Sequence, residues 1–173
     1  TMKRYCLLLL ALILIAGSSC QKKVDIEKEK QAIMAVVKAE SEAARLGNPD
    51  GLMSCYIQDE YNTRLNVNAD DYKIITGWDK LAPLFKEYTP NPEVDTTKIS
   101  FTKENAVIKI MGNTAWLICD NDWKYEAPEG ETKWENIQVT FLEKVDGVWK
   151  FSFAAWITKP EPKVVTEEPE TAK

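Results

Sequence analysis

The side chains that could carry chemistry in this chain are few, because the sequence contains no histidine. A serine or cysteine nucleophile activated by histidine is therefore excluded, and so is a zinc site built on imidazole ligands. Any acid–base chemistry must use carboxylates, tyrosine or lysine. We expect neither a metal ion nor a cofactor.

Glu40 is the first candidate, because it lies within the apolar stripe of a predicted helix. That stripe has the helical spacing of seven and four residues and comprises Ile26, Ile33, Val37 and Ala44. A carboxylate in apolar surroundings can serve as an acid or base near neutral pH. Tyr56, on the next predicted helix, could share a proton with Glu40 or donate to a ligand oxygen. In the alternative, the helix is rotated and Glu40 meets water.

A second candidate is the polar cluster Asp120-Asn121-Asp122 in the middle of a predicted strand, where Asp and Asn are disfavoured. By alternation, Asp120 and Asp122 share one face with Trp116, and Asn121 faces the other way. The cluster could be a pocket wall, a bulge or a solvated face, and it could supply a catalytic carboxylate. A metal held by two carboxylates would still need a third ligand.

Aromatic side chains are the third candidate, since six tryptophans are many for this length. Most should belong to the core, as we expect for Trp149. We place Trp78 and Trp116 beside Glu40 and Tyr56 in a ligand-binding site. On the last predicted strand, Trp156 is opposite in parity to Trp149, Phe151 and Phe153, so both strand faces are apolar. Burial in a homodimer formed through the sheet would explain this pattern.

The elements that position these residues follow a simple order. Helical patterns cover residues 26–46 and 77–88, and a second helix between them should begin at Asn48-Pro49-Asp50. Pro83 should shorten or kink the helix of residues 77–88. Residues 65–67 could form a short strand. Extended patterns then cover 98–103, 106–111, 114–125, 135–145 and 148–158, with hairpin signals at Gly112-Asn113 and Asp146-Gly147 and a longer loop at 126–132. Helices followed by an antiparallel meander predict an α+β domain.

The N-terminus predicts export. Residues 1–19 combine Lys3 and Arg4 with twelve apolar residues, which is the pattern of a secretory signal and is too short to span a membrane. Ser18-Ser19-Cys20 resembles a loose bacterial lipobox, which implies cleavage before Cys20 and lipid on that cysteine. The alternative is an ordinary signal peptide with an incidental cysteine. Residues 20–25 would then form a tether, and the chain would face the periplasm of a bacterial envelope.

Composition bounds the rest of the chain. Removing Lys3 and Arg4 leaves 20 basic against 27 acidic residues, a net charge of −7, and no dense basic run, so nucleic acid is excluded as a partner. Residues 26–158 suffice for one domain, and the proline-containing, charged residues 159–173 should be disordered. Cys55 and Cys119 could form a disulfide in an oxidising envelope or remain as two buried thiols.

The order of these elements resembles the nuclear-transport-factor-two-like superfamily, which includes SnoaL-like polyketide cyclases and ketosteroid isomerases. The matching stretches are residues 42–56, 77–85, 113–117 and 139–156, and Asp146-Gly147-Val148-Trp149 carries the strongest likeness. The resemblance implies three helices packed on a curved antiparallel sheet, forming a cone with an internal pocket. Many relatives end the last strand with a polar or histidine residue, whereas this chain has Phe153-Ala154-Ala155-Trp156.

Three functions fit this sequence. The first is a lipid-anchored protein that binds a small apolar or amphipathic molecule without catalysis. The second is an isomerase or dehydratase of the SnoaL or ketosteroid type, with Glu40, Asp120 or Asp122 as base and Tyr56 as donor. The third is a structural module that engages only a protein partner. The missing histidine and the apolar end of the last strand weigh against the enzyme.

Lipid on Cys20 leads to a direct test. In bacteria fed labelled palmitate, the wild-type chain should carry label and sediment with membranes, because acylation requires this thiol. Cys20→Ala should lose the label and leave the membrane fraction. Equal labelling of the two chains would contradict the prediction.

Overall fold

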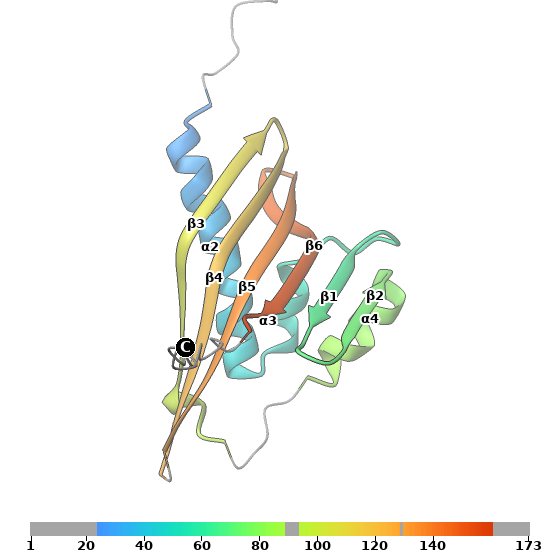
Figure 1. Ribbon diagram of the computed structural model, residues 1–173. Helices are drawn as coiled ribbons and strands as arrows, with labels where there is room; N and C mark the ends of the chain where they lie inside the picture. The colour runs from blue at the N-terminus through green and yellow to red at the C-terminus, as the bar shows by residue number, and fades with distance from the viewer. Residues whose placement is uncertain (1–23, 89–93, 129, 161–173) are drawn as a thin grey trace, which may run out of the picture.

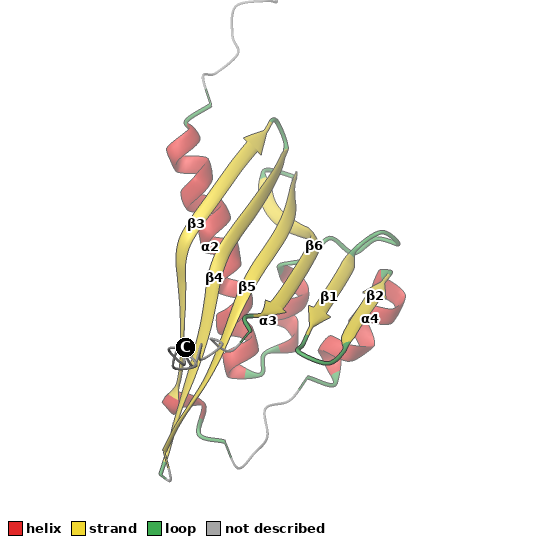
Figure 2. Ribbon diagram, viewed as in Figure 1, coloured by secondary structure: helices red, strands yellow, loops and turns green. Residues whose placement is uncertain are grey.

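The computed structural model describes residues 24–88, 94–128 and 130–160. Its elements are α2 (Ile26–Leu46), α3 (Pro49–Ser54), β1 (Thr63–Val67), β2 (Tyr72–Thr76), α4 (Trp78–Lys86), a 3₁₀ turn (Thr96–Lys98), β3 (Ile99–Met111), β4 (Thr114–Ala127), β5 (Gly130–Val145) and β6 (Val148–Thr158). All three α-helices pack against one face of a single sheet (Figures 1 and 2). The α+β prediction is confirmed. The predicted signal peptide, Cys20 and most of the predicted disordered tail lie outside the described residues.

Local chemistry explains the helix boundaries. The Asp25 side chain accepts a hydrogen bond from the Lys28 amide at the start of α2, and Gly47 ends that helix at φ 60°. Asn48 caps α3 by accepting from the Gly51 amide. Pro83 lies inside α4 without ending it. Within the described residues, no helix is long and apolar enough to cross a membrane.

The six strands lie in the order β2-β1-β6-β5-β4-β3. The meander of β3 to β6 is antiparallel, as predicted, and β1 pairs antiparallel with β2. β1 also runs parallel to β6, which makes the sheet mixed. The sequence prediction also missed β2, which lies in the mixed, polar stretch of residues 58–76. The predicted loop at 126–132 is instead a tight hairpin, in which Ala127 pairs with Gly130.

Two irregularities reshape the long strands. The predicted strands 98–103 and 106–111 are one strand, β3, with a bulge at Asn105, whose φ is 52°. On β6 the register shifts at Ser152, since Phe141 pairs with Phe153 while Leu142 pairs with Phe151. A bulge reverses the alternation of side chains. As a result, Trp156 points to the same face as Phe151, and the parity inferred from sequence is wrong at this point.

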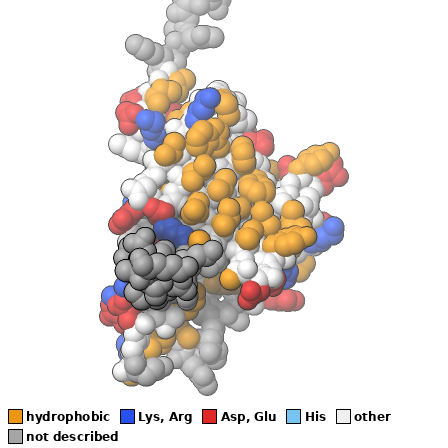
Figure 3. Space-filling model, viewed as in Figure 1, with side chains coloured by type: hydrophobic (Ala, Val, Ile, Leu, Met, Phe, Trp, Pro, Cys, Tyr) orange, Lys and Arg blue, Asp and Glu red, His pale blue; other side chains and the backbone are white. Residues whose placement is uncertain are grey.

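The sheet face turned away from the helices is apolar. Figure 3 shows hydrophobic side chains gathered over the middle of this face. The strand registers and burial pattern assign to this outer apolar face Val107, Trp116, Ile118, Ile137, Val139, Phe141, Phe153 and Ile157. Phe141 is 48% exposed and packs edge-on against Phe153 with ring centroids 5.8 Å apart. The sequence expectation of two apolar faces on the last strand is therefore met.

The opposite face holds the core, and one ionic contact fastens the start of α2 to it. The Glu29 carboxylate accepts hydrogen bonds from Lys144 Nζ at 2.7 and 2.8 Å and from Trp149 Nε1 at 2.7 Å. These donors lower the pKa of Glu29, with the Lys144 hydrogen bond as the larger cause. Trp149 is buried, as the sequence predicts.

Glu29→Gln should lower the free energy of unfolding at pH 7, because the charged carboxylate is lost while Lys144 and Trp149 remain. A carboxylate with a depressed folded pKa stabilises above its unfolded pKa, near 4.5, and loses that effect as pH falls through the folded value. Urea melts should therefore show a wild-type advantage at pH 7 that shrinks at pH 3. Glu27→Gln, at an exposed position, is the control. An advantage independent of pH would contradict this assignment.

Candidate functional site

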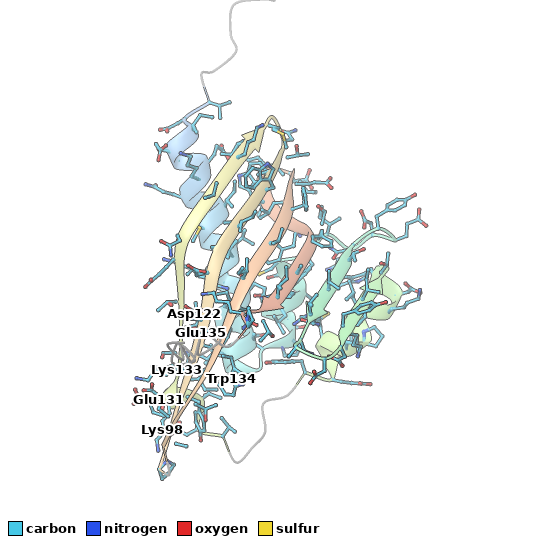
Figure 4. The ribbon with its side chains drawn as sticks, in the orientation of Figure 1. Lys98, Asp122, Glu131, Lys133, Trp134 and Glu135 are labelled. Atoms are coloured by element: carbon cyan, nitrogen blue, oxygen red, sulfur yellow. The ribbon has the colours of Figure 1, made fainter. Side chains whose placement is uncertain are left out.

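A cavity of about 680 Å³ lies between the C-terminal half of α2 and the inner face of the sheet. Its lining residues come from α2, β1, β4, β5, β6 and the segment between α4 and β3, and include Glu40, Ala44, Arg45, Arg64, Asn66, Tyr88, Val94, Asn121, Trp123, Trp134, Asn136, Trp156 and Thr158. Figure 4 shows Lys133, Trp134 and Glu135 in sequence on β5, toward the β4–β5 hairpin. The volume lies within the range of small-molecule sites.

Glu40 is the carboxylate of the cavity wall nearest to the core. It is 3% exposed and accepts hydrogen bonds from Tyr56 Oη at 3.1 Å and Ser41 Oγ at 3.3 Å. Burial raises the pKa of Tyr56 well above its ordinary value, and the charge of Glu40 raises it further, so the phenol remains a donor at neutral pH. The structure thus buries Glu40 instead of exposing it to water. It does so with partners, as a buried carboxylate requires.

A second polar group in the wall belongs to the sheet. Asn121 is fully buried, and its Oδ1 accepts from Lys103 Nζ at 2.5 Å and from Trp123 Nε1 at 3.1 Å. Lys103 also donates to Gln138 Oε1 at 2.6 Å, and Gln138 donates to Thr140 Oγ1 at 3.2 Å. The result is a hydrogen-bonded network across the inner faces of β3, β4 and β5.

Aromatic rings and one guanidinium form much of the remaining wall. Trp123, Trp134 and Trp156 line the cavity, and Arg64 reaches it from β1. The Arg64 guanidinium carbon lies 4.4 Å from the Trp156 ring centroid and 5.6 Å from that of Phe85. Cation–π contacts at these distances hold Arg64 against the wall. The interior therefore offers flat apolar surfaces with a small number of placed polar groups.

The predicted site residues separate into two groups. Glu40 lines the cavity, and Tyr56 lies behind it, packed on Phe85 and Phe151 with ring centroids 4.9 and 5.1 Å away. Trp78 is partly buried beside Phe85 and does not line the cavity, and Trp116 lies on the outer apolar face.

Asp120 and Asp122 also lie on the outer face, where both pair with Lys159, at 2.9 and 3.2 Å. Asn105 donates to Asp120 at 2.6 Å, and that hydrogen bond, followed by the one from Lys159, lowers the pKa of Asp120. Asp120 and Asp122 therefore fit the solvated-face alternative, whereas Asn121 lies in the cavity wall. Lys159, the first residue of the predicted disordered tail, is held by these contacts and by the hydrogen bond that its backbone amide donates to the Glu135 carbonyl.

Cys55 and Cys119, the cysteines within the described residues, are both free and buried. Burial raises the pKa of Cys55 to about 11, and burial likewise raises the pKa of Cys119. Both thiols are thus protonated and unreactive at neutral pH. Among the described residues, no three Cys, Asp or Glu side chains gather into a group that could hold a metal ion.

Sequence reasoning missed Lys103 and Arg64 as site residues, and it named Asn121 only as a member of the Asp120–Asp122 cluster. A signal existed for Asn121, because it shares strand parity with Leu117 and Cys119, which are buried. A polar residue on a buried strand face must have partners. For Lys103 and Arg64 no such signal exists, because β3 and β1 alternate weakly and their charged side chains are typical of exposed strands.

Neither a family model nor a curated protein matches this sequence, but solved structures do. A protein of unknown function from Shewanella oneidensis, described as NTF2-like, is 19% identical, with 75% of this chain and 98% of that chain covered and a TM-score of 0.54. A protein from Novosphingobium aromaticivorans, provisionally named a scytalone dehydratase, is 17% identical, with 76% and 85% covered and a TM-score of 0.58. The CaMKII hub of S. rosetta is 14% identical, with 75% of this chain and 95% of that chain covered and a TM-score of 0.57.

At these identities the matches establish the fold. The described part of the chain has the nuclear-transport-factor-two-like fold, which confirms the fold that the resemblance implied. Helices packed on a curved mixed sheet enclose the cavity.

The Tyr56 hydroxyl gives a stability prediction. Tyr56→Phe keeps the packed ring but removes one of the two side-chain donors to buried Glu40, so the free energy of unfolding should fall by about 1–3 kcal/mol. Tyr61→Phe, at a 74% exposed position, should change it by less than about 0.5 kcal/mol in the same urea melts. Equal losses in the two variants would show that the Tyr56–Glu40 hydrogen bond contributes nothing.

Proposed function

We propose that this chain is a lipid-tethered protein of a bacterial envelope whose domain binds a small apolar or amphipathic molecule without transforming it. The observation that carries the proposal is the cavity: three tryptophans line it, and two acceptors in its wall, the Glu40 carboxylate and the Asn121 oxygen, are held by donors within the protein. Such a wall matches ligand sites, which are mainly apolar with few fixed polar groups.

The position of the tether fits this function. Cys20 precedes Asp25 by five residues, and Asp25 caps the N-terminus of α2. The cavity uses Glu40, Ala44 and Arg45 near the other end of that helix. At 1.5 Å per residue, the cavity lies roughly 22–30 Å along α2 from Asp25, where the tether ends. A lipid on Cys20 would therefore anchor the domain without blocking the cavity.

An isomerase or dehydratase is the second candidate, and the Tyr56–Glu40 hydrogen bond favours it. A buried carboxylate with a protonated phenol beside it is a suitable base for removing a proton next to a carbonyl group. The matched structures that carry provisional dehydratase names add support by analogy. Exchange of the methyl protons of 2-acetonaphthone in D₂O, if abolished by Glu40→Gln, would favour the enzyme over the binding protein.

Assembly is a separate part of the proposal. The outer apolar face spans four strands with no helix over it, and such a patch usually meets another protein surface. We assign it to a second copy of this chain, because a homodimer through the sheet would bury Phe141 and Phe153 on both copies at once. The presence of a kinase association domain among the structural matches is consistent with this fold serving assembly.

A matched pair of variants separates the two surfaces. Trp156→Ala should weaken the binding of 2-ethylnaphthalene about tenfold, because it removes an aromatic wall, and should leave the dimer intact. Phe141→Glu should do the reverse, because it places a charge in an apolar interface. Tryptophan fluorescence titration of the nanodisc-bound chain measures ligand binding. Light scattering of the detergent-released chain measures the dimer. No binding by the wild-type chain would refute the ligand proposal, and a wild-type monomer would refute the dimer.

A further inference from the structure

Two buried side-chain atoms in the described residues have no hydrogen-bond partner: Asn62 Oδ1 and Asn121 Nδ2. Asn62 lies outside the cavity wall and donates to the carbonyls of Ile57 and Phe151, which is a structural role. Asn121 lies in the cavity wall. Leaving a buried donor unpaired costs about 1–3 kcal/mol, so its position at a ligand site points to a missing acceptor.

The orientation of this amide follows from its partners. Lys103 Nζ and Trp123 Nε1 both donate to Asn121 Oδ1, and neither group can accept. A flipped amide would place its NH₂ against both donors. The unpaired atom is therefore the nitrogen, a donor.

Lys103 strengthens this arrangement. Its ammonium is fastened by Asn121 and Gln138, and no carboxylate among the described residues lies within ion-pair distance of it. Burial lowers the pKa of Lys103, and the charge of Glu40 opposes that shift. A positive charge at the amide oxygen withdraws electron density from the amide and makes its N–H groups better donors.

We propose that Asn121 Nδ2 donates a hydrogen bond to an uncharged carbonyl oxygen of the ligand, and that Lys103 is the residue that positions Asn121. The ligand class is then a flat, apolar ketone, ester or amide, whose body packs on Trp123, Trp134 and Trp156. Glu40 and Arg64 both line the cavity, so their opposite charges favour neither an anionic nor a cationic ligand. This inference rests on the proposed binding function.

Three probes of one shape test the proposal: 2-acetonaphthone, 2-ethylnaphthalene and 2-naphthoate. They are titrated against the full lipid-anchored chain in nanodiscs, with tryptophan fluorescence as the readout and protein-free discs as the partition control. The wild-type chain should bind the ketone about tenfold more tightly than the hydrocarbon. Asn121→Leu, which has no donor, and Asn121→Asp, which replaces the donor by an acceptor, should bring the ratio of hydrocarbon to ketone dissociation constants, taken within each variant, to about one.

The positioning role of Lys103 has its own readout. Lys103→Met should lower the ketone-to-hydrocarbon ratio at least threefold, because the amide is released, and Lys103→Arg, which keeps two donors, should restore it. The ratio is taken within each variant, so partial unfolding does not affect it. A fall in both affinities with an unchanged ratio would show that Lys103 is merely structural and would overturn its positioning role.

The outcomes separate this inference from the function beneath it. If the wild-type chain binds the ketone and the hydrocarbon equally, the carbonyl assignment is overturned and the binding function stands. If naphthoate binds most tightly, the uncharged ligand class is overturned. If no probe binds, the proposed function fails together with the inference.

Discussion

The hydrogen bond from Tyr56 to Glu40 is the contact on which the rest of the site depends. A carboxylate with 3% exposure must be satisfied inside the protein, and the donor comes from the segment that follows α3. That segment is fastened in turn to β6, because Phe151 donates its amide to the Cys55 carbonyl and accepts from the Ile57 amide. One side-chain contact thereby joins α2, the end of α3 and the sheet. Glu40 lines the cavity, so this junction forms part of the cavity wall.

Sheet curvature supplies the opposite wall, and bulges decide which residues form it. The irregularity at Asn105 lies two residues after Lys103 on β3, and the one at Ser152 lies four residues before Trp156 on β6. An extra residue bends a strand and reverses its alternation. Without the shift at Ser152, Trp156 would face outward with the apolar patch and Phe153 would face the cavity. A single inserted residue therefore sorts the aromatic side chains between the ligand surface and the proposed dimer surface.

The elements with strong local signals could be predicted from sequence. Asp25, Gly47 and the Asn48-Pro49 pair mark helix boundaries that the structure reproduces, and the helical stripe places Glu40 correctly in the interior. The parts that failed depend on distant partners. The parallel pairing of β1 with β6 joins residues 90 positions apart, and no local pattern encodes it. Strand alternation assigned Trp116 and Asp120 to a common face correctly, but could not say which face the helices cover. Trp116 therefore entered the predicted site although it lies on the outer face.

The polar groups on the two sides of the cavity differ in hydrogen-bonding character. Its α2 side presents a carboxylate whose hydrogen-bonding capacity is partly taken by Tyr56 and Ser41, and its sheet side presents an amide whose oxygen is taken by Lys103 and Trp123. What remains for a ligand is an acceptor on one wall and a donor on the other, with tryptophan faces between them. A molecule with a carbonyl at one end and a hydroxyl or amine at the other would satisfy both walls in one orientation only. Because a carboxylate can only accept, and the amide oxygen is held by two groups that can only donate, this direction is built into the folded chain before any ligand arrives.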